Sequence, residues 1–283
     1  MPFGNRILLI FLLGCISLVG KASAADSKFL RFVETGPREG HVDTAITSYR
    51  LPNGVEVALI AALHIGDEKY YHVLNRRFKQ YDGVLYEMIK ERSVDPAAVG
   101  GSGHPISQLQ LGMKRILDLT FQLEEIDYSA GNLVHADMDP RTFAKLQREK
   151  GENWLTLFLQ SFLQERRLQQ SGAVRPFSAL ELLVALSQSD SAHALKWMFA
   201  HQMDQLEDLL TGIDQGIDGN GSVIVSARNR VALQVMDQQI RRGKQRLAVF
   251  YGAGHMPDLE VRLIARGFRK VRHEWVTAWD LRR

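Results

Sequence analysis

The sequence feature that most constrains the fold is an apolar run followed directly by a glycine-rich turn and a histidine. Leu247–Phe250 is a continuous apolar run, and Tyr251–Pro257 follows it with the sequence Tyr-Gly-Ala-Gly-His-Met-Pro. A short apolar run bounded by turn residues is typical of a fully buried strand. Gly252 and Gly254 indicate a tight turn or a close approach of a ligand to the backbone. The pattern predicts that His255 lies at the start of the next helix.

An earlier segment repeats this arrangement. Val55–Leu63 predicts a second strand, which ends at His64 and is followed by Gly66. In open α/β sheets, ligands bind beyond the carboxyl ends of the strands. Two histidines at strand ends are therefore a candidate functional site.

The order of predicted elements indicates an α/β fold. Ala45–Leu63 reads as a hairpin with Asn53-Gly54 at its turn. Asp67 is a candidate N-cap for a helix to about Gln80, and Gly83–Glu87 reads as the next buried strand. We expect one domain over 25–283 with a central mixed, largely parallel sheet flanked by helices.

The middle of the chain favours helices. Apolar residues recur at helical spacing from Ile106 to Phe121, and Asp139-Pro140 is a typical helix start. We predict a helical insert over about 106–215 and a loose segment over 25–44. Further helices are expected at 154–167, 179–201, 203–213, 222–242 and 257–266, the last ending at Gly267, and a final strand at 268–275.

Residues 1–24 resemble a secretory signal rather than part of the fold. Arg6 precedes the apolar run Ile7–Val19, and Ala22–Ala24 supplies small residues for cleavage after Ala24. A periplasmic or secreted protein is expected. The alternative is a lipoprotein anchored at Cys15, the one cysteine of the chain. No later segment is apolar enough for a transmembrane span.

Composition narrows the function classes. The chain has 283 residues, 45% of them hydrophobic, and a net charge of +3 spread along its length. Basic residues do not interleave with aromatic ones, so no nucleic acid partner is expected. No phosphate loop, nucleophile elbow or cysteine-based zinc motif occurs, which leaves a serine or cysteine nucleophile unsupported.

Four further residues join the two histidines as candidates. Glu87 follows an apolar strand, where burying an unpaired carboxylate is costly. It therefore either pairs with a cation such as Arg92, binds a metal ion or acts as a base. Arg228 projects from a partly apolar helix face. His135 and Asp137 would point the same way on an extended segment, which suits metal binding. A salt bridge, a solvated helix face and a packed histidine are the structural alternatives.

These residues together resemble the TraB/PrgY/GumN-like family, which includes the Tiki proteases. Gly252–His255 matches the second of the family's two Gly-x-x-His motifs, and Ala61–His64 is similar to the first. Asp82–Glu87 resembles the family's glutamate segment, and Ala227–Arg230 its arginine segment. The sequence departs from the family at Ala61, which replaces a glycine, and at Ala227, which replaces an acidic residue.

The resemblance implies a metal-dependent hydrolase that acts on peptides or related amide or ester substrates outside the cytoplasm. His64, His255 and Glu87 would hold a divalent ion such as Mn²⁺, Co²⁺ or Zn²⁺, or Glu87 would act as the base. Arg228 would stabilise negative charge on the substrate. The alternative is a non-catalytic protein that sequesters a peptide or a metal. The predicted insert is also a candidate homodimer interface.

Overall fold

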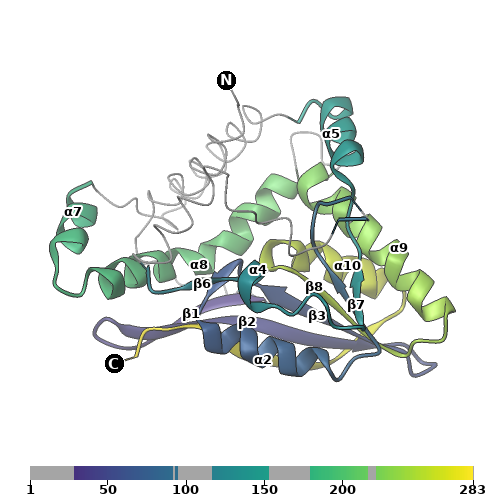
Figure 1. The fold of residues 1–283 in the computed structure, drawn as a ribbon, viewed down its shortest axis with the longest axis horizontal. Helices are drawn as coiled ribbons and strands as arrows, with labels where there is room; N and C mark the ends of the chain where they lie inside the picture. The colour runs from purple at the N-terminus through teal and green to yellow at the C-terminus, as the bar shows by residue number, and fades with distance from the viewer. Residues whose placement is uncertain (1–28, 92, 95–116, 153–178, 216–220, 283) are drawn as a thin grey trace.

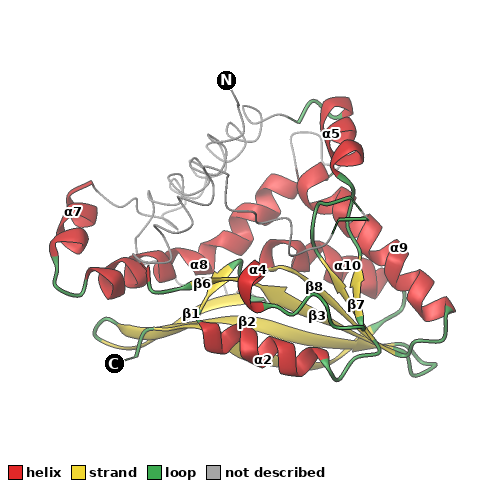
Figure 2. Cartoon of the chain, viewed as in Figure 1, coloured by secondary structure: helices red, strands yellow, loops and turns green. Residues whose placement is uncertain are grey.

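The protein forms helices packed around one central sheet (Figure 1, Figure 2). This computed structural model describes residues 29–91, 93–94, 117–152, 179–215 and 221–282. The signal segment, Cys15, Arg92 and the predicted helix at 154–167 lie outside these residues. The described part confirms the predicted α/β class with a mixed, mostly parallel sheet.

The central sheet has seven strands in the described residues, in the order β1-β2-β3-β8-β5-β7, with β9 also paired to β2. Their bounds are β1 (Leu30–Gly36), β2 (Glu39–Arg50), β3 (Glu56–Ala62), β5 (Gly83–Tyr86), β7 (Leu133–His135), β8 (Arg246–Gly252) and β9 (Arg269–Asp280). A separate pair joins β4 (Ile65–Gly66) to β6 (Thr120–Phe121).

Four neighbouring strands run parallel. β3 and β5 both pair in parallel with β8, and β7 pairs in parallel with β5. In this register Ala62 lies opposite Gly252, and Tyr86 lies opposite both Phe250 and His135. The four carboxyl ends therefore lie side by side at one edge of the sheet.

Helices cover both faces of the sheet. α2 (Glu68–Phe78) lies on one face, whereas α9 (Arg228–Arg241) and α10 (Met256–Ala265) lie on the other (Figure 1). α8 (Ser191–Gln215) packs on β1 and β2. The remaining described helices are α4 (Gln122–Glu125), α5 (Pro140–Glu149) and α7 (Ala179–Ser187).

Burial on both faces explains the unbroken apolar sequence of β8. Leu247–Tyr251 is at most 1% exposed, and the Phe250 ring packs against Phe78 of α2 at a centroid distance of 4.9 Å. Strands covered on both sides carry apolar residues continuously rather than in alternation. The strand is thus held rigidly where it delivers the turn that follows it.

Two turns follow the sequence prediction. In the β2–β3 hairpin, Gly54 has φ +92° and its N–H donates to Leu51 O at 3.0 Å. After α10, Gly267 has φ +88° and its N–H donates to Ile264 O at 2.9 Å. Glycine adopts this left-handed conformation without a side-chain clash.

Several sequence predictions are wrong. Residues 29–44 are not loose, because most of them belong to β1 and the start of β2. The helix expected near Phe121 is the strand β6 there, and the helix break expected at Gln202 lies instead between α7 and α8. The helical insert over 106–215 is not confirmed, since β7 within it belongs to the central sheet. Hydrophobic spacing alone cannot exclude such short strands.

None of the helices in the described ranges combines the length and apolar character that crossing a membrane requires.

The hairpin turn gives a direct test of backbone geometry. Gly54→Ala should lower the free energy of unfolding by roughly 1–2 kcal/mol, because an L-residue is strained at this φ. The matched control is Gly131→Ala, an exposed glycine without a positive φ, where an added Cβ also meets nothing within 4 Å. Urea denaturation of both variants checks this, and equal losses would contradict the account.

Candidate functional site

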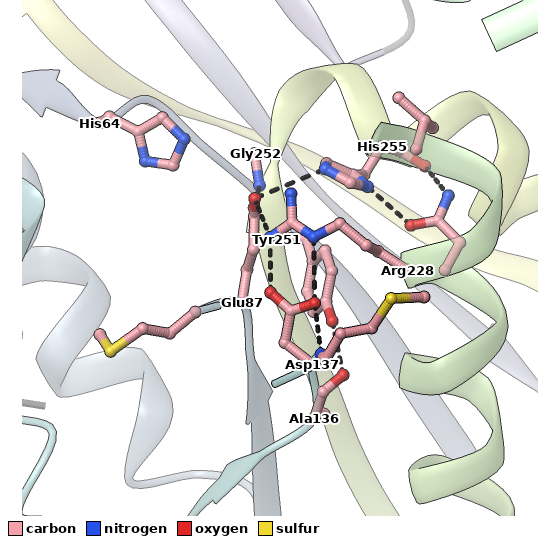
Figure 3. Close-up of polar contacts among 12 residues, drawn as sticks. His64, Glu87, Ala136, Asp137, Arg228, Tyr251, Gly252 and His255 are labelled. Carbon is pink, nitrogen blue, oxygen red and sulfur yellow. Dashed lines mark hydrogen bonds and ion pairs between the residues drawn. The ribbon is translucent and has the colours of Figure 1, made fainter. Parts of the chain in front are cut away.

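Four side chains follow the four parallel strand ends in the order of the strands across the sheet. His64 comes after β3, His255 after β8, Glu87 after β5 and Asp137 after β7. Figure 3 shows Glu87, Asp137 and His255 gathered around Arg228, with His64 to one side. The parallel sheet thus brings together residues that are far apart in the sequence.

Arg228 enters this group from the start of α9. A π-helical turn (Val223–Ala227) precedes the helix, with Ala227 N–H donating to Ser222 O at 3.0 Å. π-helical turns are rare and often lie at functional sites. Arg228 is 7% exposed, and its guanidinium points to the ends of β5 and β7.

Two carboxylates bind this guanidinium. Arg228 Nε donates to Asp137 Oδ1 at 3.0 Å and Nη2 to Asp137 Oδ2 at 2.5 Å. Nη2 also lies 2.8 Å from Glu87 Oε1. Burial lowers the pKa of Arg228, but Glu87 and Asp137 outweigh it and raise the pKa above its ordinary value. The arginine is therefore permanently charged.

Glu87 is held ionised. Its side chain is 10% exposed, and its Oε2 accepts from Gly252 N–H at 2.7 Å. Burial raises the pKa of this carboxyl. Arg228 and then His255 lower it by a larger amount, so the pKa lies well below 4.5. Hydrogen bonds and opposite charge favour the ionised form. Glu87 is a carboxylate at neutral pH.

His255 lies beside this carboxylate, at the predicted helix start. The 3₁₀ turn Ala253–His255 leads directly into α10, and His255 is 6% exposed. Its Nε2 is 3.5 Å from Glu87 Oε1, and its Nδ1 is 2.7 Å from Asn229 Oδ1. The ring packs edge-on against Tyr251. Both ring nitrogens thus have defined neighbours.

His64 is the exposed member of the group. Its Nδ1 lies 3.2 Å from Oε1 of the buried Gln122, the first residue of α4. The ring edge with Nε2 is turned to Gly252: a Cβ built on that glycine would lie 3.6 Å from His64 Nε2. His64 therefore borders the same space as Glu87 and His255.

Gly252 provides that space. Its φ is −52°, so no left-handed conformation requires glycine. The added Cβ would instead touch Glu87 Oε2 at 3.4 Å and the His255 ring at 3.9 Å. These are ordinary van der Waals distances, so an added Cβ would fit but would occupy the space on which the three polar side chains converge. Gly254 is buried in the 3₁₀ turn and has no positive φ.

The remaining predicted residues differ in placement. Asp137 joins the site through Arg228, whereas His135 donates from Nε2 to Met88 O at 2.7 Å. The two do not share a metal position. Asp139 is the N-cap of α5, as predicted, and accepts from the N–H groups of Arg141 and Thr142.

The sequence prediction missed two amide side chains, Gln122 and Asn229. Each places its oxygen at Nδ1 of one site histidine. Asn229 directly follows Arg228, but a buried asparagine on a helix has no distinctive sequence pattern. Gln122 lies 58 residues from His64 and its N–H donates to His64 O at 3.0 Å. A tertiary contact of this kind cannot be read from spacing.

A separate group could hold a metal ion. Among the residues that the structure describes, Glu68, His72 and Glu125 alone bring three potential ligand atoms within 4.8 Å of one another. Glu68 and His72 are exposed on α2, and Glu125 is partly buried on α4. His64, Glu87 and His255 are not that close together. The exposed group shares no residue with the strand-end site.

Comparison with protein-family models, with curated proteins and with solved structures gives no match to this chain.

The ion pair predicts a pH-dependent stability. Glu87→Gln should lower the free energy of unfolding by about 1–3 kcal/mol at pH 7, because Arg228 loses a charged partner. The folded pKa of Glu87 lies below 4.5, so its contribution is complete above about pH 5 and is lost as pH falls through the folded pKa. Urea denaturation across pH measures this difference.

The matched control is Glu91→Gln, an exposed glutamate 3.8 Å from Arg141. It should change the free energy of unfolding by less than about 0.5 kcal/mol. A Glu87→Gln loss that is no larger than the control, or that grows as pH falls below 4.5, would contradict the ion-pair account.

Proposed function

We propose that the protein is a metal-dependent hydrolase of peptides or related amide or ester substrates, with its site at the carboxyl ends of the parallel strands. The observation that carries the proposal is the convergence of His64, Glu87 and His255 beside the Cα of Gly252. Two imidazoles and a carboxylate are a common ligand set of catalytic zinc. The resemblance to the TraB/GumN-like family supports the same activity.

The charge of the site fits a divalent cation. Glu87 and Asp137 contribute two negative charges and Arg228 one positive charge, which leaves −1 with both histidines neutral. Glu87 and Asp137 have side chains that are 10% and 0% exposed, so solvent screens this charge poorly. A bound dication would reverse the net charge to +1 and favour an anionic transition state.

The geometry requires one side chain to move. A metal holds nitrogen and oxygen ligands at about 2.0–2.2 Å, so the ligand atoms must lie within about 4.4 Å of one another. The three candidate ligands do not meet even a 4.8 Å limit. His255 is buried and the Glu87 side chain is only 10% exposed, whereas His64 is exposed and can rotate. We propose that His64 completes the site when the ion enters.

The ionised state of Glu87 separates its two candidate roles. A general base works best with a pKa near the working pH, and the pKa of Glu87 lies well below 4.5. A carboxylate that stays ionised is a good ligand. The proposal therefore assigns Glu87 to the metal, and the bound ion would supply a Lewis acid and a water of lowered pKa.

Arg228 has two tasks in this proposal. Its Nε and Nη2 hold Asp137 and Glu87, which fixes the carboxylate of Glu87 in place. The contacts described for these carboxylates do not use Nη1. We propose that this nitrogen donates to the substrate oxygen as negative charge develops there.

A second candidate function is binding without turnover. It is favoured by the contacts of Glu87, whose two oxygens already accept from Arg228 and Gly252. The replacement of glycine by Ala61 does not favour it. Ala61 lies in β3 opposite Tyr251 and has no positive φ, so the alanine is unstrained there.

The test is metal binding and cleavage with matched variants. The native protein should bind Mn²⁺, Co²⁺ or Zn²⁺ by calorimetry and cleave members of a peptide and ester library. His255→Ala should lose both, and Glu87→Gln should lower kcat/KM by at least about 100-fold. The control is His72→Ala, which removes the histidine of the exposed group and should leave cleavage unchanged.

The outcomes are distinct. Equal metal content and equal cleavage in native protein and His255→Ala would overturn the proposal. Metal binding and thermal stabilisation by a peptide, with no product by mass spectrometry under any metal, would establish the binding function instead.

A further inference from the structure

Asn229 is a fully buried polar side chain of the site. It is 0% exposed and makes three hydrogen-bond contacts through its amide. A buried amide without these partners would cost about 1–3 kcal/mol. None of the roles proposed above for the site uses this residue.

The surroundings of Asn229 fix which way its amide points. Nδ2 lies 3.1 Å from His255 O and 2.7 Å from Asp258 Oδ2. Both are acceptors, so the nitrogen must face them and donate. Rotating the amide by 180° would place its oxygen against a carbonyl and a carboxylate. Oδ1 is therefore the atom that faces the His255 ring.

This orientation fixes the tautomer of His255. Oδ1 lies 2.7 Å from His255 Nδ1 and can only accept, so Nδ1 carries the ring proton. In the neutral ring, Nε2 then holds a lone pair directed at Glu87 Oε1, 3.5 Å away. Two acceptors face each other there. Either a proton on Nε2 or a metal cation between the two atoms removes the repulsion.

Gln122 makes the equivalent contact at the other histidine. Its Oε1 lies 3.2 Å from His64 Nδ1, and its Nε2 donates to Tyr128 OH at 2.9 Å. The Tyr128 hydroxyl accepts from Nε2 in this arrangement, which leaves Oε1 as the atom at the His64 ring. The contact leaves Nε2 of His64 as the free nitrogen beside Gly252.

We infer that Asn229 and Gln122 are positioning residues that hold His255 and His64 in the Nδ1–H tautomer, with both Nε2 lone pairs facing the space beside Gly252. The two amides come from different helices, α9 and α4, and reach different strand ends. The same chemical contact at both histidines supports a shared role. Partners of this kind set the tautomer and orientation of metal-binding histidines.

The start of α9 places two of these side chains next to each other. Arg228 binds Glu87 while Asn229, the next residue, binds His255. Both side chains are buried in the first turn, directly after the π-helical turn. One helix start therefore positions a carboxylate and an imidazole at once. The consequence for metal affinity rests on the proposed function, whereas the tautomer does not.

The first experiment reads the tautomer directly. Long-range proton–nitrogen NMR of metal-free protein, labelled at histidine, is recorded at a pH where the rings are neutral. Signals are assigned with His64→Gln and His255→Gln. Both rings should show a protonated Nδ1 and a bare Nε2. A protonated Nε2 on either neutral ring would overturn the inference for that histidine and its amide.

The second experiment compares variants by Zn²⁺ titration in a His72→Ala background. Gln122→Leu should weaken binding by about 10–100-fold, whereas Gln122→Glu, which keeps an acceptor at Nδ1, should restore it to within about threefold of Gln122. Asn229→Leu should weaken binding similarly and mix the tautomers of His255. The control Asp258→Ala removes another partner of Asn229 but leaves Oδ1 at the ring.

The results separate the two claims. Equal effects of Asn229→Leu and Asp258→Ala on both the tautomer and the affinity would reduce Asn229 to a stabilising residue and overturn the inference. If Zn²⁺ does not bind the strand-end site, the proposed function fails, and the NMR spectrum of the metal-free protein still decides the tautomer.

Discussion

The guanidinium of Arg228, held between Glu87 and Asp137, is the interaction on which the site depends. It joins the ends of β5 and β7 to the start of α9. Desolvating these three groups is costly, and only their close mutual contacts offset that cost. The same contacts keep Glu87 ionised, so that its second oxygen can accept from Gly252 at the end of β8. One buried charge cluster thus aligns three neighbouring strand ends.

The parallel sheet decides which residues reach that cluster. β3, β8, β5 and β7 all end at one edge, and each contributes one polar side chain or turn. Buried, rigid strands give His255 and Glu87 fixed positions, whereas His64 remains exposed at the border. A site with a rigid half and a movable ligand suits an ion that enters and leaves. The amides of Asn229 and Gln122 orient the rings without contacting that space.

Much of this arrangement could be predicted from the sequence, because it follows from short-range patterns. The apolar runs predict the buried strands, and Gly54 and Gly267 predict turns. His64, Glu87 and His255 are candidates because each lies at the end of a predicted strand or directly after its turn. Arg228, Asp137, Gln122 and Asn229 belong together only through tertiary contacts, so spacing could not show which of them meet. β1 was missed because its residues are only partly buried and include charges, which removes the hydrophobic signal. The short strands β6 and β7 carry too few residues for any period to register.

X-ray absorption spectroscopy of the zinc-loaded protein tests the central claim most directly. The His72→Ala background excludes the exposed group on α2 and α4. The account predicts two imidazole ligands and oxygen ligands in this protein, one imidazole after His64→Ala, and unchanged coordination after His135→Ala. A zinc ion without imidazole ligands would contradict this account. So would a coordination shell that is unchanged after His64 or His255 is replaced by alanine.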